Sequence, residues 1–250
     1  MKRLLLLSAL LIFACSSDDS TSDDDNNNEL LNCDGNPVPT IVYGTQEWTV
    51  ENACHTTYRD GTPIPEITNP QVWVTLTTGA WCYINNDPNK GKVYNRYAIR
   101  GIHDTSPDTP NKVFAPVDWD VPSNADWEIL KTYLIASGFN YDGTTEGNKI
   151  AKSMASTTGW IAYSETGAPG NDQSLNNSSG FNATSGFRKY TGLFEDYKAV
   201  FWSSSLYGTT QSSQTSLGYY YAFDYFSKNL YFSVNDNEEE SGYSVRLVKY

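Results

Sequence analysis

The sequence predicts an α+β fold, with two short helices flanking a small antiparallel sheet and long loops. Helix-type apolar spacing occurs before Gly159, whereas short apolar segments bounded by turn residues dominate after it. The chain of 250 residues is also rich in Gly, Tyr and Trp, and it has few long helical patterns. Helices followed by an antiparallel sheet indicate one α+β domain with a single core.

The clearest predicted helix begins after Ser123. This residue is a good N-cap, and Asp126 follows three positions later, close to a capping box. Apolar side chains then recur at helical spacing through Leu134, and Gly138 ends the helix. Two further short helices are expected: one at 148–155, and one from Thr68 or Asn69 through Leu76 with Pro70 in its first turn.

Short strands are predicted on both sides of the main helix. The first two form a hairpin from Ile41 to Val50, with its turn at Gly44 and Thr45. Other strands are expected at 81–83, 180–183, 200–203, 219–225 and 230–234. The last strand alternates apolar Tyr243, Val245 and Leu247 with polar Ser244 and Arg246, which predicts one buried and one polar face.

The N-terminus predicts export. Residues 1–14 carry early positive charge and then a short apolar run, which is typical of a signal peptide and too short to span a membrane. Ile12–Cys15 resembles a bacterial lipobox, so we expect Cys15 to be lipidated. The acidic residues after it resemble the surface-export signal of Bacteroidetes lipoproteins. We therefore expect a signal peptide at 1–14, a lipidated, flexible, acidic tether at 15–39 and a folded domain at 40–250.

This reading places the protein in the outer membrane as a lipoprotein exposed at the cell surface, with the membrane as a partner through the anchor. Whether the anchor faces the periplasm or the exterior stays open. The formal net charge of −12 argues against nucleic acid as a partner, because binding to phosphates rests largely on Lys and Arg.

Three cysteines remain after Cys15. An exported protein can form a disulfide, and Cys33, Cys54 and Cys82 leave one thiol over. Cys33 with Cys54 and Cys54 with Cys82 are both plausible pairs, and the sequence does not choose between them. The spacing shows no zinc-type Cys or His cluster, and no cofactor is expected.

Candidate catalytic residues are few. Only His55 and His103 are present, and neither lies in a recognisable nucleophile motif. We therefore expect the protein not to be an enzyme. Asn235, Asp236 and Glu238 offer oxygen ligands that would suit calcium, although a polar turn explains the same residues more simply.

Tyrosines crowd the C-terminal half and are the candidate ligand contacts. Tyr207, Tyr219, Tyr221 and Tyr225 are singled out. Tyr219 and Tyr221 share one face of a predicted strand, so that face is a candidate surface for stacking on sugars or anchoring a protein. The alternative is that most of these rings pack in the core. Loops at 138–147 and 164–179 are further places for recognition.

Several segments, in order, resemble the Fibrobacter succinogenes major paralogous domain, over about residues 40–250. They are Tyr43–Trp48 with Glu51–Asn52, Tyr58–Ile64, Trp73–Leu76, Trp81–Asn86, Tyr94–Ala98, Trp119 with Val121–Ser123 and Trp127, Ser179–Ala183, Trp202–Ser204, and Ser244–Arg246. The resemblance implies that Trp48, Trp73, Trp119, Trp127 and Trp202 are core residues.

The same resemblance implies a C-type-lectin-like fold, distantly similar to formylglycine-generating enzymes. This chain departs from the family in three places: Ala115 and Leu247 stand where the family commonly has cysteines, and Asp120 replaces a histidine. The joint loss of both cysteines is expected if they normally pair.

These observations predict a surface-anchored lipoprotein with a non-catalytic binding or adhesion domain for glycans or another surface protein. Two alternatives remain: a structural component of the cell envelope without its own pocket, and an enzyme of unknown type on a formylglycine-generating-enzyme-like fold. The sequence does not identify the ligand, the calcium dependence or the oligomeric state.

Overall fold

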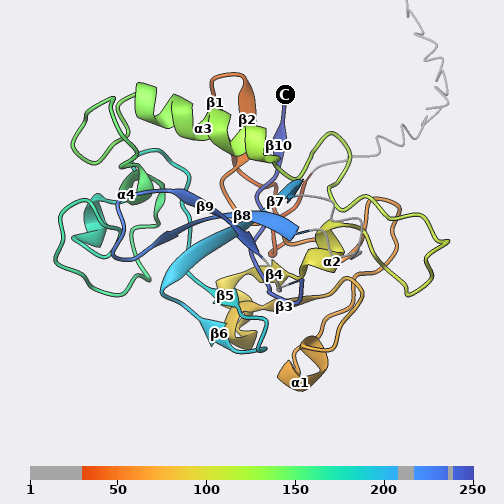
Figure 1. The fold of residues 1–250 in the computed structure, drawn as a ribbon. Coiled ribbons are helices and arrows are strands. Elements are labelled where there is room, and N and C mark those ends of the chain that lie inside the picture. Colours follow the sequence, from red (N-terminus) through yellow and green to blue (C-terminus); the bar gives the residue numbers. More distant parts are fainter. Residues whose placement is uncertain (1–29, 208–216, 236–238) are drawn as a thin grey trace, which may run out of the picture.

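Small antiparallel sheets and short helices make up the fold of this protein. The computed structural model describes residues 30–207, 217–235 and 239–250. In these ranges the strands form two three-stranded and two two-stranded sheets (Figure 1). The protein is therefore a small mixed α/β domain with few helices, as the sequence predicts at this level.

The longest strands form the central sheet, in the order β7 (Lys198–Tyr207), β8 (Leu217–Asp224) and β9 (Tyr231–Asn235). The longest helix, α3 (Asn124–Ala136), lies against one face of this sheet (Figure 1). Trp127 of α3 stacks on Tyr221 of β8 with ring centroids 4.9 Å apart. This contact joins the helix and the sheet in one hydrophobic core.

The two ends of the domain meet in a second sheet, β1 (Thr40–Tyr43), β2 (Gln46–Thr49) and β10 (Val248–Lys249), in the order β1-β2-β10. The predicted hairpin is confirmed, since Tyr43 pairs with Gln46 across the turn and Gly44 adopts a φ of +65°. Pairing of β10 with β2 therefore holds the C-terminal end of the domain against its beginning.

The other elements are short. The two-stranded sheets are β3 (Trp81–Tyr83) with β4 (Lys92–Tyr94), and β5 (Phe187–Arg188) with β6 (Phe194–Glu195). The remaining helices are α1 (Pro70–Trp73), α2 (Arg96–Ile99) and α4 (Ala151–Met154), with 3₁₀ turns at Ile84–Asn86, Pro88–Lys90 and Gln173–Leu175. The helices predicted at 148–155 and from Pro70 are present but shorter than expected.

The start of α3 follows the sequence prediction closely. The Ser123 side chain accepts from the Asp126 backbone N–H, and the Asp126 carboxylate accepts from the Ser123 backbone N–H at 2.7 Å. This reciprocal pair satisfies donors that the first helical turn leaves free. At the other end, Gly138 has a φ of +79° and stops the helix.

Two predicted strands require correction. Residues 180–183 make only an isolated bridge from Ala183 to Ala155, because Gly180 and Asn182 both have positive φ and interrupt an extended chain. The segment 243–247 has no polar outer face. Ser244 and Arg246 are 2% and 1% exposed, because chain packs on both sides of this segment.

The tryptophans expected in the core are buried, including Trp119, which is 7% exposed. Ala115 and Leu247, which stand where the family commonly has cysteines, belong to one hydrophobic cluster. No helix in the described part of the chain is long and apolar enough to cross a membrane.

Candidate functional site

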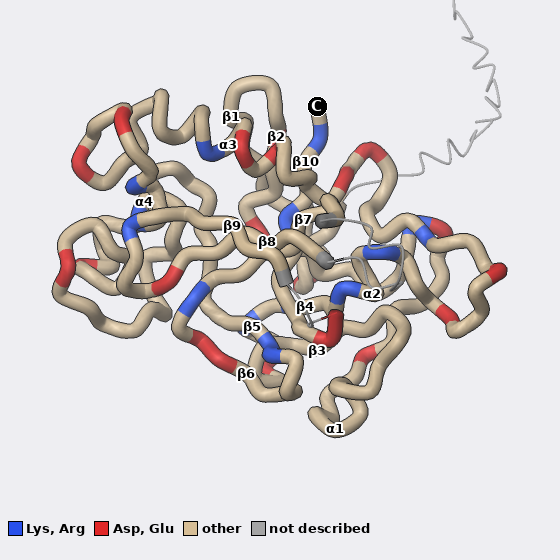
Figure 2. The backbone as a smooth tube through the Cα atoms, viewed as in Figure 1, with Lys and Arg blue, Asp and Glu red and all other residues tan. Residues whose placement is uncertain are grey.

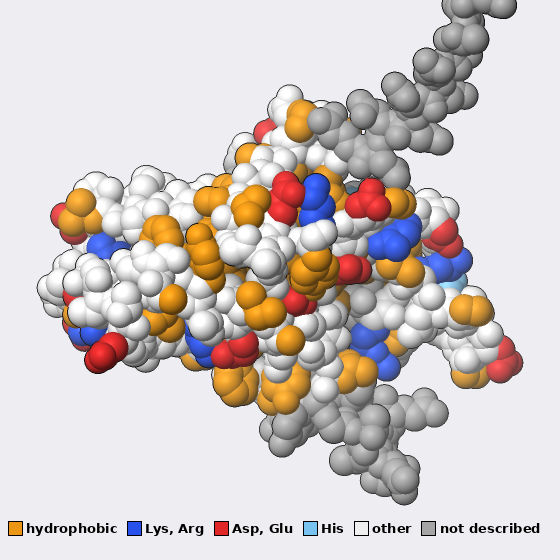
Figure 3. Space-filling view, turned by 90° about the horizontal axis from the view of Figure 1, so that it is seen from above, with side chains coloured by type: hydrophobic (Ala, Val, Ile, Leu, Met, Phe, Trp, Pro, Cys, Tyr) orange, Lys and Arg blue, Asp and Glu red, His pale blue; other side chains and the backbone are white. Residues whose placement is uncertain are grey.

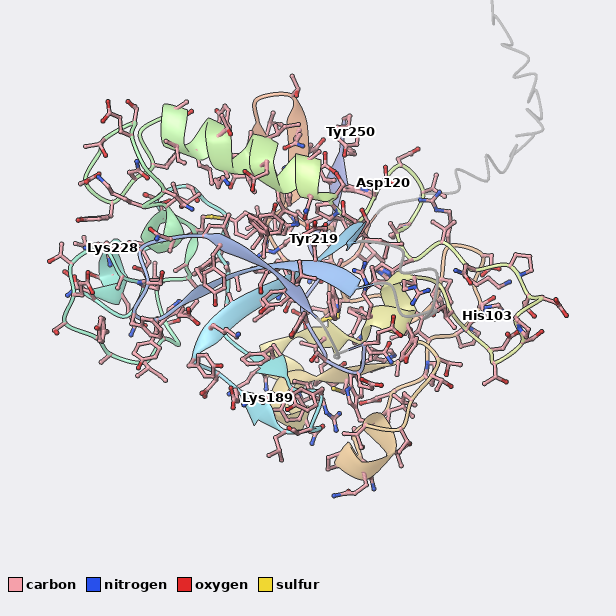
Figure 4. The ribbon with its side chains drawn as sticks, viewed as in Figure 1. His103, Asp120, Lys189, Tyr219, Lys228 and Tyr250 are labelled. Carbon is pink, nitrogen blue, oxygen red and sulfur yellow. A yellow bond between two sulfur atoms is a disulfide. The ribbon has the colours of Figure 1, made fainter. Side chains whose placement is uncertain are left out.

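The two histidines do not form a catalytic pair. The His55 ring packs 4.5 Å from the Phe114 ring, centroid to centroid, and burial lowers the pKa of His55 to about 4. His103 lies in a loop at one end of the molecule, where its Nε2 is 3.4 Å from a carboxylate oxygen of its neighbour Asp104 (Figure 4). His55 is therefore part of the packed interior, and His103 makes a contact with its own neighbour in the chain.

The four candidate tyrosines do not make one surface. Tyr221 is 1% exposed under α3, so it is a core residue, which corrects its assignment as a ligand contact. Tyr219 (Figure 4) is half-buried beside Phe232, whereas Tyr225 follows the last residue of β8 and packs near Tyr163. The side chain of Tyr207 lies outside the described residues.

Hydrophobic side chains on the face shown in Figure 3 lie in separate groups interrupted by polar atoms. Acidic and basic residues are interspersed along the chain (Figure 2), and pairs such as Lys112–Asp60 and Lys228–Glu165 bring opposite charges within 3 Å. Such exposed pairs contribute little to stability. Neither pattern marks a binding surface by itself.

The calcium candidates and the lipidation site lie beyond what the structure describes. Asn235 ends β9, but its side chain, Asp236, Glu238 and Cys15 are not described. Among the described residues, no group of three or more His, Cys, Asp or Glu side chains is arranged to hold a metal ion.

The disulfide joins Cys33 to Cys54, with their α-carbons 5.2 Å apart. This settles the choice that the sequence left open. Cys82 is the remaining thiol and is fully buried against Arg188, whose Nη1 lies 3.3 Å from Cys82 Sγ. Burial raises the pKa of Cys82 to about 11, so the thiol is protonated and unreactive at neutral pH.

Two adjoining hollows of about 420 and 470 Å³ meet where Asp120 and Tyr250 lie beside the start of α3 (Figure 4). Asp126 lines the second of them, but both of its carboxylate oxygens already accept hydrogen bonds, from Gln46 Nε2 at 3.1 Å and from Ser123 Oγ at 2.6 Å. The buried carboxylate of this region is therefore used by the fold itself.

A third hollow of about 360 Å³ lies beside the disulfide, and we call it the Arg246 groove. Five separate parts of the chain line it: Cys33–Asp34, Val50–Asn52, Tyr83 with Pro88–Gly91, Asn182 with Thr184, and Arg246. Charged, amide, hydroxyl and aromatic side chains therefore surround one small volume.

Arg246 lies in the wall of this groove and is 99% buried. Its guanidinium lies 4.5 Å from the Phe181 ring and 5.6 Å from the Phe201 ring. Nη1 donates to the Thr49 carbonyl at 2.8 Å and Nη2 to the Asn182 carbonyl at 3.2 Å, but Nε has no partner. Burial lowers its pKa to about 9, which still leaves the group charged at neutral pH.

Asn52 is held beside this arginine by the extended segment 243–247. Its Nδ2 donates to Ser244 Oγ at 3.1 Å, and the next residue, Ala53, donates its backbone N–H to the Val245 carbonyl at 2.7 Å. The Asn52 Oδ1 atom is buried and accepts no hydrogen bond. Asn52 and Arg246, which both line the groove, therefore each carry one buried polar atom without a hydrogen-bond partner.

Tyr83 and Cys33 of the disulfide form another part of the lining. The Tyr83 ring is half-buried and packs edge-on to Trp81 at 5.3 Å, with Lys92 Nζ 5.4 Å from its centre. Lys92 in turn donates to the Cys54 carbonyl at 2.6 Å. Lys92 therefore contacts both the Tyr83 ring and Cys54 of the disulfide. The other cysteine of that disulfide, Cys33, precedes Asp34 in the groove lining.

Other buried polar atoms in the described residues also lack partners, so an unpaired atom alone does not mark a site. Arg96, for example, is 1% exposed and leaves its Nε unpaired, but it lines none of the three hollows described above. What distinguishes the Arg246 groove is that two of its lining residues carry such an atom.

Sequence reasoning missed this groove. Glu51–Asn52, Tyr83, Asn182 and Arg246 were noted as parts of the family resemblance, but none was assigned to a site. Their only shared signal was membership in those segments, because no spacing rule connects residues this far apart.

The fold and the groove together define a small mixed α/β domain with a polar hollow beside its disulfide. A comparison with protein families matches residues 41–249 to the Fibrobacter succinogenes major domain, so this chain belongs to that family. Comparisons with curated proteins and with solved structures gave no match.

Proposed function

We propose that this protein binds carbohydrate without catalysis, in the Arg246 groove of a C-type-lectin-like domain carried by a surface lipoprotein. The observation that carries the proposal is the composition of the groove. It combines carboxylates (Asp34, Glu51), amides (Asn52, Asn182) and one half-buried aromatic ring (Tyr83) around about 360 Å³. Sugar hydroxyls both donate and accept hydrogen bonds, and sugar ring faces stack on aromatic rings.

The electrostatics of the groove support a neutral ligand. Arg246 and Lys90 are balanced by Asp34 and Glu51, and Glu51 acts on Arg246 as an opposing charge. Along the described residues, acidic and basic side chains are interspersed and form no continuous basic stripe of the kind that tracks a nucleic acid backbone (Figure 2).

Two further parts of the proposal rest on other observations. The pairing of β2 with β10, which brings the ends of the domain together, supports the C-type-lectin-like class. The signal-type N-terminus with its lipobox-like Cys15 supports an outer-membrane lipoprotein exposed at the surface. Cys15→Ala should release the protein from the membrane fraction, and retention there would refute the anchor.

The function is tested with the full chain on a glycan array, once with calcium and once with chelator, followed by calorimetry on each hit. Tyr83→Ala should weaken binding about tenfold, because a stacked ring contributes roughly 1 kcal/mol or more. Tyr190→Ala is the matched control, since Tyr190 is 49% exposed and lies in the β5–β6 turn outside the groove. Absence of glycan binding in both buffers would refute the proposal.

A further inference from the structure

We infer that the outer edge of β9 (Tyr231–Asn235) pairs with the same strand of a second copy of this chain, so that two copies form a symmetric dimer. β9 is an edge strand of the central sheet, because the strand order is β7-β8-β9. None of its residues lines the Arg246 groove, so this interface is separate from the proposed carbohydrate site.

Hydrogen bonds at β7 show the direction of the backbone groups in the sheet. Trp202 N–H donates to the Ser244 carbonyl at 3.0 Å, and Ser244 N–H donates to the Val200 carbonyl at 3.1 Å. These two β7 residues therefore direct backbone groups away from β8, and Phe201 between them faces its β8 partner Tyr221. Tyr221 in turn directs its N–H and C=O groups at β7 and not at β9.

The outward groups of β9 follow from this alternation. Tyr220, the neighbour of Tyr221 in β8, faces β9 and exchanges backbone hydrogen bonds with its partner Ser233. The residues on either side of Ser233, Phe232 and Val234, therefore direct their N–H and C=O groups away from the sheet. In the part of the chain that the structure describes, no hydrogen bond joins these four groups to another residue.

The fold covers the same edge just before β9. Leu230 lies two positions before Phe232 and has the same backbone direction. Its N–H donates to Asn148 Oδ1 at 3.2 Å, and its carbonyl accepts from Asn148 Nδ2. One side-chain amide thus takes the place of a neighbouring strand at Leu230. Among the described residues nothing equivalent bonds to Phe232 or Val234, so the open edge begins after Leu230.

β9 also lacks the features that keep edge strands apart. Edge strands of natural sheets usually carry charge, proline or a bulge. β7 has such protection, because it bonds to Ser244 and its register shifts between Trp202 and Leu206. β9 has the sequence Tyr-Phe-Ser-Val-Asn, without charge or proline. Phe232 is 55% exposed, although Tyr221 opposite it is 1% exposed, so an apolar ring lies beside the open edge.

Two copies of this edge are complementary to each other. When Ser233 faces Ser233 of the second copy on a two-fold axis, Phe232 faces Val234 of the second copy, and the reverse pair forms on the other side. Both residues of each pair have outward groups, so the two pairs exchange four backbone hydrogen bonds. Each Phe232 ring also packs beside Val234 of the other copy. The absence of charge favours this arrangement, because like charges that face each other across the axis would repel.

The first test measures mass against concentration by sedimentation velocity on the full chain. One strand pair is smaller than a stable interface, so we expect a dimer that dissociates between about 1 μM and about 1 mM. Val234→Pro removes the outward N–H from each copy but keeps the pairing with β8, and it should weaken dimerisation about tenfold or more. Val234→Ala is the matched control, since it keeps the N–H and should change the dissociation constant less than about threefold.

A cysteine at the two-fold axis tests the register. Facing residues of a non-hydrogen-bonded pair have α-carbons about 4.5 Å apart, which is within the range of a disulfide. Ser233→Cys should therefore give a disulfide-linked dimer under mild oxidation, seen by non-reducing electrophoresis. Asn229→Cys, at an exposed position of the β8–β9 turn, is the control and should stay mostly monomeric. Cys82, the free thiol of the described residues, is buried and does not contribute.

The outcomes decide the inference. Thermal melts confirm that each variant folds, and the concentration series and the cross-link stand even where Val234→Pro does not fold. A monomer at every concentration would refute self-pairing and leave the edge to another extended chain. A dimer that Val234→Pro and Val234→Ala weaken equally would place the interface elsewhere and refute the inference. Cross-linking of Asn229→Cys as readily as of Ser233→Cys would do the same.

Discussion

Arg188 and Arg246 are both buried arginines, but the hydrogen bonds that their side chains make differ. Arg188 and Arg246 are 0% and 1% exposed, and each guanidinium lies 4.4–5.6 Å from the centres of two aromatic rings. Arg188 donates from Nε to the Gly192 carbonyl, and from Nη1 and Nη2 to the Ile67 and Thr68 carbonyls, at 2.9–3.0 Å. Arg246 uses only its two terminal nitrogens on carbonyls.

The difference separates a structural arginine from a candidate binding arginine. Arg188 uses all three of its side-chain nitrogens on carbonyls, and this one side chain pins residues 67–68 to the β5–β6 turn. Arg246 lines a hollow and keeps one buried donor, Nε, without a partner. Burial and aromatic packing alone therefore do not mark a site, and neither does an unpaired donor unless its residue also lines a hollow.

The largest expected effect tests that contrast directly. Arg188→Met should lower the free energy of unfolding by about 4 kcal/mol, because three buried carbonyls lose their donors. Arg246→Met should cost less, about 2–3 kcal/mol, because only two carbonyls lose a donor. Urea unfolding measures both, and an equal or larger loss for Arg246→Met would contradict the comparison.

Removing the disulfide should increase local opening around the Arg246 groove without affecting the region around Arg188. Replacing Cys33 and Cys54 together with Ser should cost about 3 kcal/mol, since the bridge closes a loop with a sequence separation of 21. Hydrogen exchange should rise around Asp34 and Asn52 but not around Arg188. Exchange that rises equally in both regions would show that the disulfide does not stabilise the groove region locally.

Acid should lower the free energy of unfolding through His55, which follows Cys54 of the disulfide in the chain. Because the folded protein holds the His55 pKa near 4, below its ordinary 6.5, the unfolded chain binds the extra proton more readily as pH falls. Stability is therefore full above pH 6.5 and falls between 6.5 and 4, by about 2 kcal/mol from pH 7 to pH 5.

Urea unfolding at the two pH values measures this loss, and His55→Phe should flatten it because the ring packs among Phe114 and Tyr94. An undiminished pH dependence in His55→Phe would assign the acid sensitivity to other groups.

The smallest effect concerns Tyr221, which the sequence suggested as a ligand contact. Tyr221→Phe keeps the stack on Trp127 and loses only the hydroxyl, which lies 3.1 Å from Glu128 Oε1. We expect about 1 kcal/mol less stability and no change in glycan affinity. A calorimetric loss of binding in this variant would move the site from the Arg246 groove to the β8 face.

The elements that could be predicted have local causes. The Ser123–Asp126 capping box and the Gly44 turn depend on residues within a few positions of each other, so the sequence alone shows them. The strand predicted at 180–183 failed for a local reason too, because positive φ at Asn182 is rarer than the extended conformation that its neighbours suggested.

The groove could not be predicted in this way. Asn52 meets Ser244 across 192 positions, and Arg246 meets Asn182 across 64. The alternating pattern of 243–247 suggested a polar outer face because it shows which residues alternate but not what packs on each side. The prediction that Tyr221 contacts a ligand was wrong for the same reason, since only the position of α3 decides that this ring is covered.

By itself, the sequence determined the α+β class, the main helix and first hairpin, the buried tryptophans and the resemblance to the family, because each of these rests on residue type, near-neighbour spacing or motif order. Only the tertiary structure decided which cysteines pair, which polar residues are buried and where five distant segments enclose a hollow. Those features depend on contacts between parts of the chain that the sequence separates widely, and their geometry exists only after folding.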